Sequence, residues 1–156
     1  ISSGLAVRQS GQYMDSTFNG LNRYNKITGL FQNHTANDTQ ADGLTHSSIW
    51  CIVKIQGTLW LGTYFGGVNY FNPEYEIYTR YSYSSNEKKA EQPVVGRTIE
   101  DKDGNLWIGT EGGGLNYYNR RTREFKWYRP QEGRKAISHN NVKSAFIMMP
   151  IKKLYG

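Results

Sequence analysis

The sequence predicts an all-β fold made of β-propeller blades, each a four-stranded antiparallel sheet, as a partial propeller of about three blades plus the start of a fourth. Aromatic residues make up 14% of the 156 residues and glycine occurs 17 times; aromatic side chains favour strands, and glycine favours turns. A second observation is a unit that recurs every 47 residues. The third is that each unit contains four short runs separated by turn signals.

The repeat is visible within this single chain. Residues 59–63, Leu-Trp-Leu-Gly-Thr, return as Leu-Trp-Ile-Gly-Thr at 106–110, and residues 67–72 return at 114–119. One further step of 47 residues towards the N-terminus leads to Gly-Leu-Asn-Arg-Tyr-Asn at 20–25. The same offset relates three sets of apolar residues: Phe31, Tyr78 and Phe125; Tyr13, Trp60 and Trp107; and Leu5, Ile52 and Ile99.

The length of the runs favours strands over helices. In the third unit the four runs cover residues 95–100, 105–110, 115–119 and 124–129, and each has a typical strand length. A period near 47 also fits pairs of helices, but no stretch repeats apolar residues at the i, i+3, i+4, i+7 spacing of a helix. Four antiparallel strands in a repeated unit are the pattern of a propeller blade.

The two repeated tryptophans are expected on the second strand of their units, packed between neighbouring blades. An indole that buries about 150–250 Å² is large enough to fill such a gap. The rest of the layer between blades is predicted to consist of six further apolar residues: Leu21, Val68, Leu115, Phe31, Tyr78 and Phe125.

The repeat also predicts where the blades lie. We expect blades at residues 1–36, 47–83 and 94–129, with the first strand of the first blade at 5–9, and a truncated start of a further blade at 137–156. Closed propellers typically have 4–8 blades, and an open arc leaves two inter-blade faces exposed. The expected partners are therefore the remaining blades of the same chain or another copy of the chain.

Residues that carry most enzyme chemistry do not gather in this sequence. His34, His46 and His139 are scattered, with no two at a metal-ligand spacing, and no nucleophile-elbow or zinc-protease motif occurs. Cys51, the one cysteine, is interpreted as a small strand residue, and Gly112-Gly113-Gly114 lacks the following lysine and helix of a phosphate loop. We expect no catalytic residues, no metal site and no cofactor, and therefore not an enzyme.

The net charge of +6 arises entirely after residue 86. Much of it lies in a basic run at residues 120–135. A patch for an anionic partner is one interpretation. A solvated hairpin and loop is the interpretation we favour, because Glu124 and Glu132 interrupt the run and no nucleic-acid motif accompanies it. We expect no bound nucleic acid, and no apolar run approaches the ~20 residues that a membrane helix needs.

If the propeller binds a ligand, the expected place is one end of its central channel. The loops between second and third strands and the loops between blades gather there. Aromatic faces and charged hydrogen-bonding groups suit sugars, and Arg97 suits acidic ones. Ordinary loop or core packing is the alternative for each candidate. The five candidates are Tyr64, Phe65, Glu111, Trp50 and Arg97.

Residues 99–116, Ile-Glu-Asp-Lys-Asp-Gly-Asn-Leu-Trp-Ile-Gly-Thr-Glu-Gly-Gly-Gly-Leu-Asn, resemble the two-component regulator propeller repeat. The resemblance extends over about the whole chain, and the first copy departs from it at Asp15 and Ser16. It implies seven-bladed propellers, commonly two in tandem, in the periplasmic ectodomain of a homodimeric inner-membrane hybrid sensor of the Bacteroidetes type. It also implies that such a sensor carries a histidine kinase elsewhere, senses glycan fragments and controls polysaccharide-utilisation genes.

Three functions remain open at this point. The first, implied by the resemblance, is a sensory module that binds an oligosaccharide ligand. The second is a propeller scaffold that binds no small ligand and serves protein–protein interaction or dimerisation. The third is a propeller-borne lyase or glycosidase, which needs a pair of carboxylates or a histidine–metal cluster at the channel mouth. We rank it last, because the sequence supplies no obvious pair.

Overall fold

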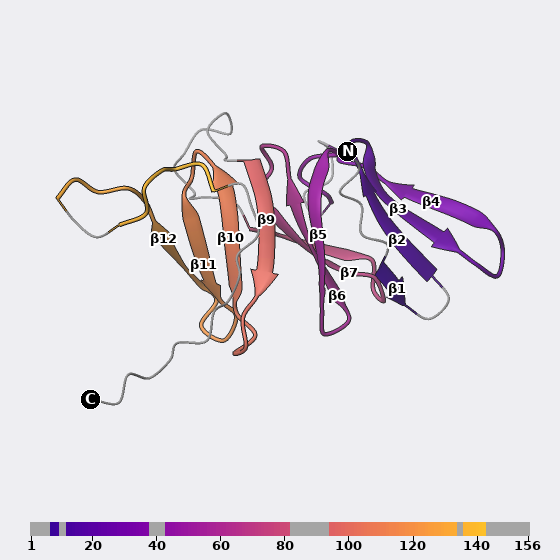
Figure 1. Cartoon of the computed structure of the whole chain (residues 1–156). Coiled ribbons are helices and arrows are strands. Elements are labelled where there is room, and N and C mark those ends of the chain that lie inside the picture. The colour runs from indigo at the N-terminus through magenta and orange to yellow at the C-terminus, as the bar shows by residue number, and fades with distance from the viewer. Residues whose placement is uncertain (1–6, 10–11, 38–42, 82–93, 134–135, 143–156) are drawn as a thin grey trace.

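A computed structural model describes residues 7–9, 12–37, 43–81, 94–133 and 136–142. Within them the chain forms three antiparallel sheets of four strands and no helix (Figure 1). The predicted all-β fold of blade-like sheets is confirmed. In these ranges no helix is long and apolar enough to cross a membrane.

Each sheet is one blade, and its strands follow one another in chain order. Blade one contains β1 (Val7–Gln9), β2 (Gln12–Thr17), β3 (Gly20–Asn25) and β4 (Leu30–His34). Blade two contains β5 (Ile49–Ile55), β6 (Thr58–Thr63), β7 (Val68–Asn72) and β8 (Ile77–Tyr81). Blade three contains β9 (Val94–Glu100), β10 (Leu106–Glu111), β11 (Leu115–Asn119) and β12 (Glu124–Tyr128).

The blades stand side by side in the order of the sequence (Figure 1). Strand β9 lies against β5 and β6 of the blade before it, and β5 lies against β2 of blade one. We call the face that a blade turns to the next blade its trailing face, and the face that it turns to the preceding blade its leading face.

Two apolar clusters join the blades. The trailing face of blade one supplies Met14 and Leu21 to a cluster whose other members include Leu59, Leu61 and Phe71 on the leading face of blade two. The second cluster joins blade two to blade three in the same way. Its buried members are Cys51, Ile55, Trp60, Val68, Val95, Leu106, Ile108 and Tyr118. A sheet that is apolar on both faces packs against a neighbouring sheet on each side, and blades packed in this way form a propeller.

Trp60 has the inter-blade position that the repeat predicts. It is 2% exposed, and its ring centroid lies 5.4 Å from that of Tyr81 in its own blade and 5.6 Å from that of Tyr118 in the next blade. Trp107 holds the equivalent place in blade three and is half-buried, stacked on Tyr128 with centroids 5.8 Å apart. Blade three is the last described sheet, so its trailing face has no further sheet against it within the described residues.

The structure corrects two of the residue equivalences drawn from the 47-residue offset. Tyr24 pairs with Tyr13, whereas Phe71, its equivalent in blade two, pairs with Leu59. Tyr13 therefore stands at the place of Leu59, and Met14 stands at the place of Trp60. The β2–β3 connection of blade one is one residue shorter than that of blade two, and this shifts the second strand.

The second correction concerns the first strands. Val53 pairs with Trp60, and Ile99 pairs with Trp107. Ile99 is thus the equivalent of Val53 and not of Ile52. The reason is the turn between the first two strands, which is one residue longer in blade three than in blade two.

In each described blade, a hydrogen bond between a threonine and a glycine closes the connection between the second and third strands. We call this hydrogen bond the threonine–glycine clasp. The threonine hydroxyl at the end of the second strand donates to the carbonyl of a glycine that begins or directly precedes the third strand. The pairs are Thr17 with Gly20 at 3.1 Å, Thr63 with Gly67 at 2.9 Å, and Thr110 with Gly114 at 2.8 Å. Because the clasp recurs, the loops at this end of the blades have a shared frame.

The segments that lead out of blades one and three also match. The backbone N–H of Gly20 donates to Ser47, and that of Gly114 donates to Asn140, at 2.7 and 2.8 Å. In the first segment the N–H of Ser48 donates to Nδ1 of His46, and in the second the N–H of Asn141 donates to Nδ1 of His139. Residues 137–142 therefore leave blade three as residues 44–49 leave blade one.

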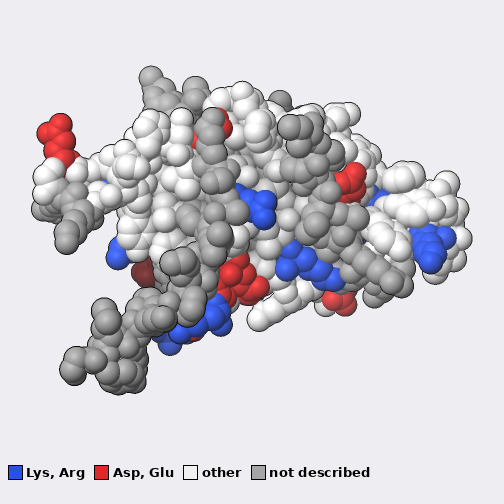
Figure 2. Space-filling model, in the orientation of Figure 1, with Lys and Arg blue, Asp and Glu red and all other residues white. Residues whose placement is uncertain are grey.

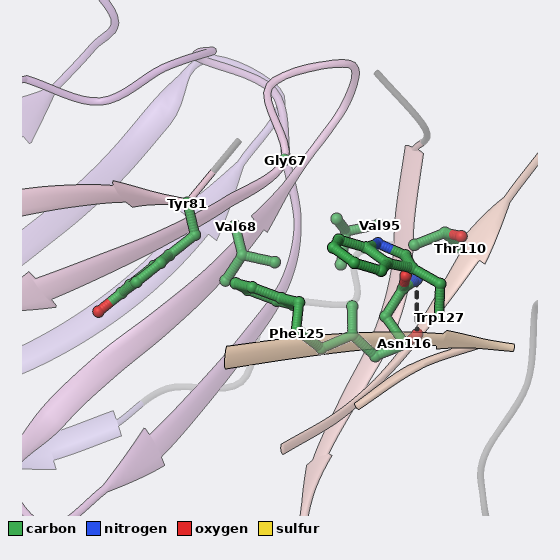
Figure 3. Close-up of a pocket in the computed structure, with 9 residues that line it drawn as sticks. Gly67, Val68, Tyr81, Val95, Thr110, Asn116, Phe125 and Trp127 are labelled. Atoms are coloured by element: carbon green, nitrogen blue, oxygen red, sulfur yellow. Dashed lines mark hydrogen bonds between the residues drawn. The ribbon is translucent and has the colours of Figure 1, made fainter. Parts of the chain in front are cut away.

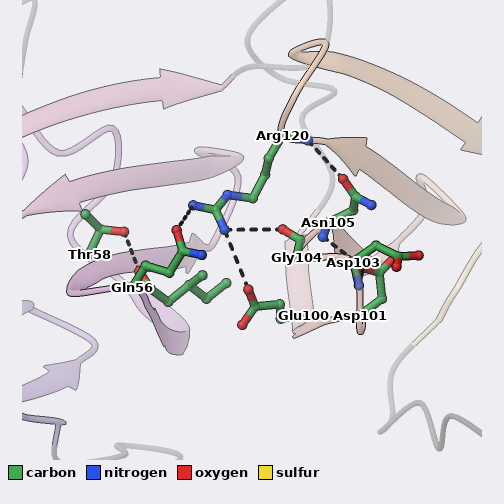
Figure 4. A network of polar contacts seen from close by, with 9 residues as sticks. Gln56, Thr58, Glu100, Asp101, Asp103, Gly104, Asn105 and Arg120 are labelled. Atoms are coloured by element: carbon green, nitrogen blue, oxygen red, sulfur yellow. Dashed lines mark hydrogen bonds and ion pairs between the residues drawn. The ribbon is translucent and has the colours of Figure 1, made fainter.

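At the opposite end, one arginine connects blades two and three. Arg120 donates from Nη2 to Oε1 of Gln56 at 3.3 Å and from Nη1 to the carbonyl of Gly104 at 3.3 Å, and it lies 3.6 Å from Oε1 of Glu100 (Figure 4). Gln56 belongs to the β5–β6 turn of blade two, so this contact links the two blades at the end opposite the threonine–glycine hydrogen bonds.

Some expected elements lie outside the described residues. Leu5, at the start of the expected first strand, is one of them, and β1 is described over Val7–Gln9. The expected start of a further blade at 137–156 is described only through Val142.

Candidate functional site

Four aromatic side chains form an exposed cluster at the end of the blades that carries the β2–β3 and β6–β7 loops. Trp50 and Tyr64 are stacked, with ring centroids 5.7 Å apart and planes inclined by 16°. Phe65 lies edge-on to Tyr64 at 4.2 Å, and Phe18 lies edge-on to Trp50 at 6.1 Å. We call these four residues the aromatic cluster; it spans blades one and two.

The cluster is open to solvent. Phe18 is 71% exposed, Phe65 46%, and Trp50 and Tyr64 36% each. A stacked pair with two flanking rings exposes apolar surface that a folded protein normally buries. Contiguous exposed apolar surface marks an interaction site more often than scattered single residues do.

A bulge places Trp50 in this cluster. The pairing of β5 with β6 passes from Ile49 opposite Thr63 to Cys51 opposite Gly62, so that Trp50 is the extra residue. A bulge bends the strand and re-aims a side chain, and bulges are common beside binding sites.

The neighbouring loop is held in an unusual backbone conformation. Phe65 has φ of +60°, a left-handed value that costs a bulky side chain energy. Its neighbour Tyr64 donates its backbone N–H to the carbonyl of Ser48 at 2.9 Å, and the ring of His46 lies 6.0 Å from the Tyr64 ring. The inter-blade segment therefore fixes the loop, and residues held in strained conformations cluster at functional sites.

The structure brings together three of the five residues that the sequence singled out: Trp50, Tyr64 and Phe65. Sequence reasoning missed Phe18. A signal was available, because Phe18 lies 47 residues before Phe65 and each stands three residues before the first apolar residue of the third strand.

Arg97 and Glu111 lie on blade three. Arg97 is exposed on β9 opposite Gly109, in the place that Cys51 holds on β5 opposite Gly62. Glu111 ends β10 and follows Thr110 as Tyr64 follows Thr63. These two charged residues thus belong to the blade after the aromatic cluster.

The one cysteine is a packing residue. Cys51 is buried, with Sγ 3.7 Å from Oγ1 of Thr98. Burial raises the pKa of its thiol, and the contact with Thr98 and the charge of Arg97 oppose this only in part. A thiol that resists ionisation is a poor nucleophile and a poor metal ligand. Among the described residues, no group of three or more His, Cys, Asp or Glu side chains could hold a metal ion.

Two other hollows lie between blades. An apolar crevice between blades two and three is lined by residues that include Val68, Tyr81, Phe125 and Trp127 (Figure 3). A polar groove between blades one and two is lined by residues that include Asn33, His34 and Glu76. Neither hollow contains a member of the aromatic cluster.

Charged side chains of both signs alternate on the face shown in Figure 2. Arg23 forms an ion pair with Glu76 between blades one and two, and Arg120 contacts Glu100.

Comparison with solved structures gives the fold. The extracellular domain of the putative one component system BT4673 from B. thetaiotaomicron matches 85% of this chain at 23% identity with a TM-score of 0.64. The extracellular domain of the putative hybrid two component system BT4673 from the same organism matches 77% of it at 22% identity with a TM-score of 0.60. The chain spans only 16% of either of those chains. No curated protein matches this chain.

A comparison with family models matches one copy of the repeat. Residues 90–112 match the two component regulator propeller model, which overlaps the segment at 99–116 on which the sequence resemblance depends. Those residues contain all of β9 and all of β10, the first two strands of blade three. Over these residues the chain is similar to the two-component regulator propeller repeat.

Proposed function

We propose that this chain is part of the extracytoplasmic sensor region of a hybrid two-component regulator, and that the aromatic cluster binds a sugar ring of a glycan fragment. The observation that carries the proposal is the stacked and exposed pair Trp50–Tyr64, flanked by Phe18 and Phe65. Two solved structures of similar fold are described as extracellular domains, which supports an extracytoplasmic place, and we propose that this place is the periplasm.

The chemistry of the cluster suits a sugar. The C–H face of a pyranose ring is apolar and packs on an aromatic face, while its hydroxyl groups need hydrogen-bonding partners at the rim. The Trp50 indole N–H, the Tyr64 hydroxyl and the His46 ring supply such groups next to apolar surface. Binding sites commonly combine aromatic walls with a few polar groups in this way.

The strained loop supports a binding role over simple packing. Phe65 adopts its left-handed conformation without burying its ring, since 46% of the side chain is exposed. A conformation that costs energy and leaves a phenyl group in solvent contributes little to the fold. A ligand that covers the ring would recover that apolar surface.

The second candidate is a scaffold whose aromatic cluster contacts another protein. The openness of the four rings favours it, because large exposed aromatics are also enriched at protein interfaces. A lyase or glycosidase ranks third, since the cluster contains no carboxylate.

Isothermal titration calorimetry against a panel of neutral and acidic oligosaccharides tests the proposal. The sensor binds one member with defined stoichiometry, and Trp50→Ala or Tyr64→Ala weakens binding by about tenfold or more, which corresponds to about 1.4 kcal/mol. Tyr75→Ala is the matched control, because Tyr75 is an aromatic residue that is 66% exposed on the β7–β8 turn, away from the cluster. No binding by any member, or equal binding by all variants, would reject the glycan site in favour of the scaffold.

A further inference from the structure

The contact between blades two and three is filled with aromatic rings. Tyr81 stacks on Trp60 with ring centroids 5.4 Å apart, and it lies 5.1 Å from Tyr118 of the next blade. Phe125 completes the group, with its ring centroid 6.0 Å from that of Tyr81. Rings at these distances attract one another and leave little space between the two sheets.

The contact between blades one and two has smaller side chains at two of the matching places. His34, at the end of β4, takes the place that Tyr81 takes at the end of β8, and Met14 takes the place of Trp60. The side chains at these two places therefore fill less of the contact. The polar groove between these blades holds about 420 Å³, within the range of about 300–1,000 Å³ that is usual for small-ligand sites.

Two buried polar atoms at the polar groove have no hydrogen-bond partner among the described residues. They are Nε2 of His34 and the hydroxyl oxygen of Tyr78, and the two rings lie on opposite blades with centroids 6.2 Å apart. Buried polar atoms are almost always hydrogen-bonded, because an unpaired one destabilises the fold. The two rings are close enough for one small polar molecule to pair with both atoms.

Asn33 supplies a third polar group on the wall of the polar groove. Its Nδ2 donates to Oδ1 of Asn22 at 2.6 Å and to the carbonyl of Asn19 at 3.2 Å. Both hydrogens of the amide are thus used, which fixes the orientation of the group. Its Oδ1 receives no hydrogen bond from the described part of the chain and is left as an acceptor.

The polar groups of the groove are uncharged or already paired. Burial lowers the pKa of His34, although the charge of Glu76 opposes this, so the imidazole is neutral at pH 7. Burial raises the pKa of Tyr78, and the charge of Glu76 adds to the shift, so the phenol keeps its proton. The Glu76 carboxylate forms an ion pair with Arg23. The groove therefore suits an uncharged ligand better than an ion, whose lost hydration it would replace only in part.

We propose that the polar groove is a second binding site, separate from the aromatic cluster, for a neutral and hydroxyl-rich molecule of the size of a monosaccharide or polyol. A hydroxyl group both donates and accepts, so such a molecule pairs with His34, Tyr78 and Asn33 at once. It contacts β4 of blade one and β8 of blade two, and its binding therefore stabilises the contact between the two blades. The site does not depend on any glycan at the aromatic cluster.

Nuclear magnetic resonance of the nitrogen-15-labelled chain tests whether the groove takes such a molecule. The probes are galactose, glucose, xylose and sorbitol, each added up to about 100 mM. At least one probe shifts the ring-nitrogen signals of His34 and the side-chain signals of Asn33. The ring signals of His139, which follows blade three, stay constant. If no probe shifts the His34 signals, the groove holds only water and the proposal is wrong.

Charged sugars test the class of ligand. Galacturonate and galactosamine are the charged counterparts of galactose, and each binds at least about fivefold more weakly than galactose because its charged group loses hydration in the groove. The corresponding acid and amine serve for another sugar that binds. Tighter binding of either charged form would overturn the assignment to a neutral ligand.

Tyr78→Phe separates a ligand-binding hydroxyl from a structural one. The change removes only the hydroxyl and keeps the ring, whose centroid lies 4.4 Å from that of Phe71. Affinity for the probe falls by about tenfold, while the urea midpoint without probe stays the same or rises, because an unpaired buried group is gone. Tyr75→Phe is the matched control, since it makes the same change at a tyrosine that is 66% exposed, and it alters neither quantity. Unchanged affinity in Tyr78→Phe would remove that hydroxyl from the site and overturn the proposal.

Two further variants locate the bound probe. His34→Tyr gives blade one the residue that blade two has at this position, and the larger ring fills the groove, so the probe no longer shifts the Asn33 signals while circular dichroism shows a folded chain. Trp50→Ala, in the aromatic cluster, leaves these shifts unchanged, which distinguishes failure of this site from failure of the glycan site. Shifts that persist in His34→Tyr, or that vanish in Trp50→Ala, would place the probe elsewhere and reject the groove.

Discussion

Trp60 and Tyr118 belong to different blades, yet their ring centroids lie only 5.6 Å apart. Trp60 is 2% exposed, while its equivalent Trp107 is half-buried on the trailing face of the last described blade. The same residue type at the same register position therefore has two environments, and the difference is whether another blade packs on it.

Replacement of the two tryptophans measures that difference. Trp60→Ala removes a fully buried indole and should cost about 3–5 kcal/mol of unfolding free energy. Trp107→Ala should cost clearly less in the monomeric chain, because part of its ring is already in solvent. Urea unfolding followed by circular dichroism measures both. Equal losses would contradict the assigned inter-blade role of Trp60.

Much of the apolar layer between blades could be predicted from the sequence, because each copy of the repeat places its apolar residues in a similar way. Trp60, Val68, Tyr78 and Phe125 lie in or against the inter-blade clusters, as expected. Phe31 and Leu115 were expected there too, but neither is in a cluster, and Phe31 is 73% exposed. Residues of blade one were harder to place. Tyr13 was aligned with Trp60, but Met14 occupies that place, because a connection shorter by one residue moves the second strand while the third strand keeps its spacing.

The candidate site was predictable only in part. Tyr64 and Phe65 follow the repeated Gly-Thr of the second strand, so their loop could be located from the sequence. The stacking of Trp50 on Tyr64 depends on a bulge at Ile49–Cys51, and no local residue pattern signals that bulge. Which loop of blade one approaches Trp50 depends on how the blades pack, and that is why Phe18 was missed.

The threonine–glycine clasp predicts that one methyl group added to its glycine strongly lowers the stability of the fold. Gly114 has φ of +77°, and a Cβ there would collide with the backbone carbonyl of Tyr128. Gly114→Ala should therefore cost well over 1 kcal/mol of unfolding free energy. Gly29→Ala is the control, because Gly29 has φ of +70° with open space around it and so suffers only the backbone penalty. If both variants lose the same stability, the collision is unimportant.

His34 predicts a pH dependence of stability. Burial lowers the pKa of His34 below its ordinary 6.5, with the charge of Glu76 opposing this shift and that of Arg23 adding to it. The unfolded chain therefore takes up a proton at higher pH than the folded chain, and stability falls as the pH drops through 6.5 towards the lowered value. Urea unfolding between pH 8 and 5 should show this decline, and His34→Gln should flatten it. An unchanged slope in the variant would assign the decline to other groups.

The burial of Cys51 predicts that its thiol is unreactive in the folded chain. Its side chain is buried between blades two and three, and burial raises its pKa. Because thiolates react and thiols do not, a maleimide or disulfide reagent should leave Cys51 unmodified in the folded chain and label it completely in denaturant. Mass spectrometry measures both. Rapid labelling of the folded chain would mean that the contact between the two blades opens readily.

Phe65 tests whether strain in the cluster serves binding rather than folding. Its left-handed backbone, at φ of +60°, costs about 1–2 kcal/mol for a residue with a side chain, whereas glycine adopts it freely. Phe65→Gly should therefore unfold at equal or higher urea concentration than the original chain, while its affinity for an oligosaccharide falls because one wall of the cluster is gone. Stability and binding then change in opposite directions, as they do where a functional residue is held against its preference. A variant that loses both would show that the Phe65 ring supports the fold itself, through its edge-on contact with Tyr64.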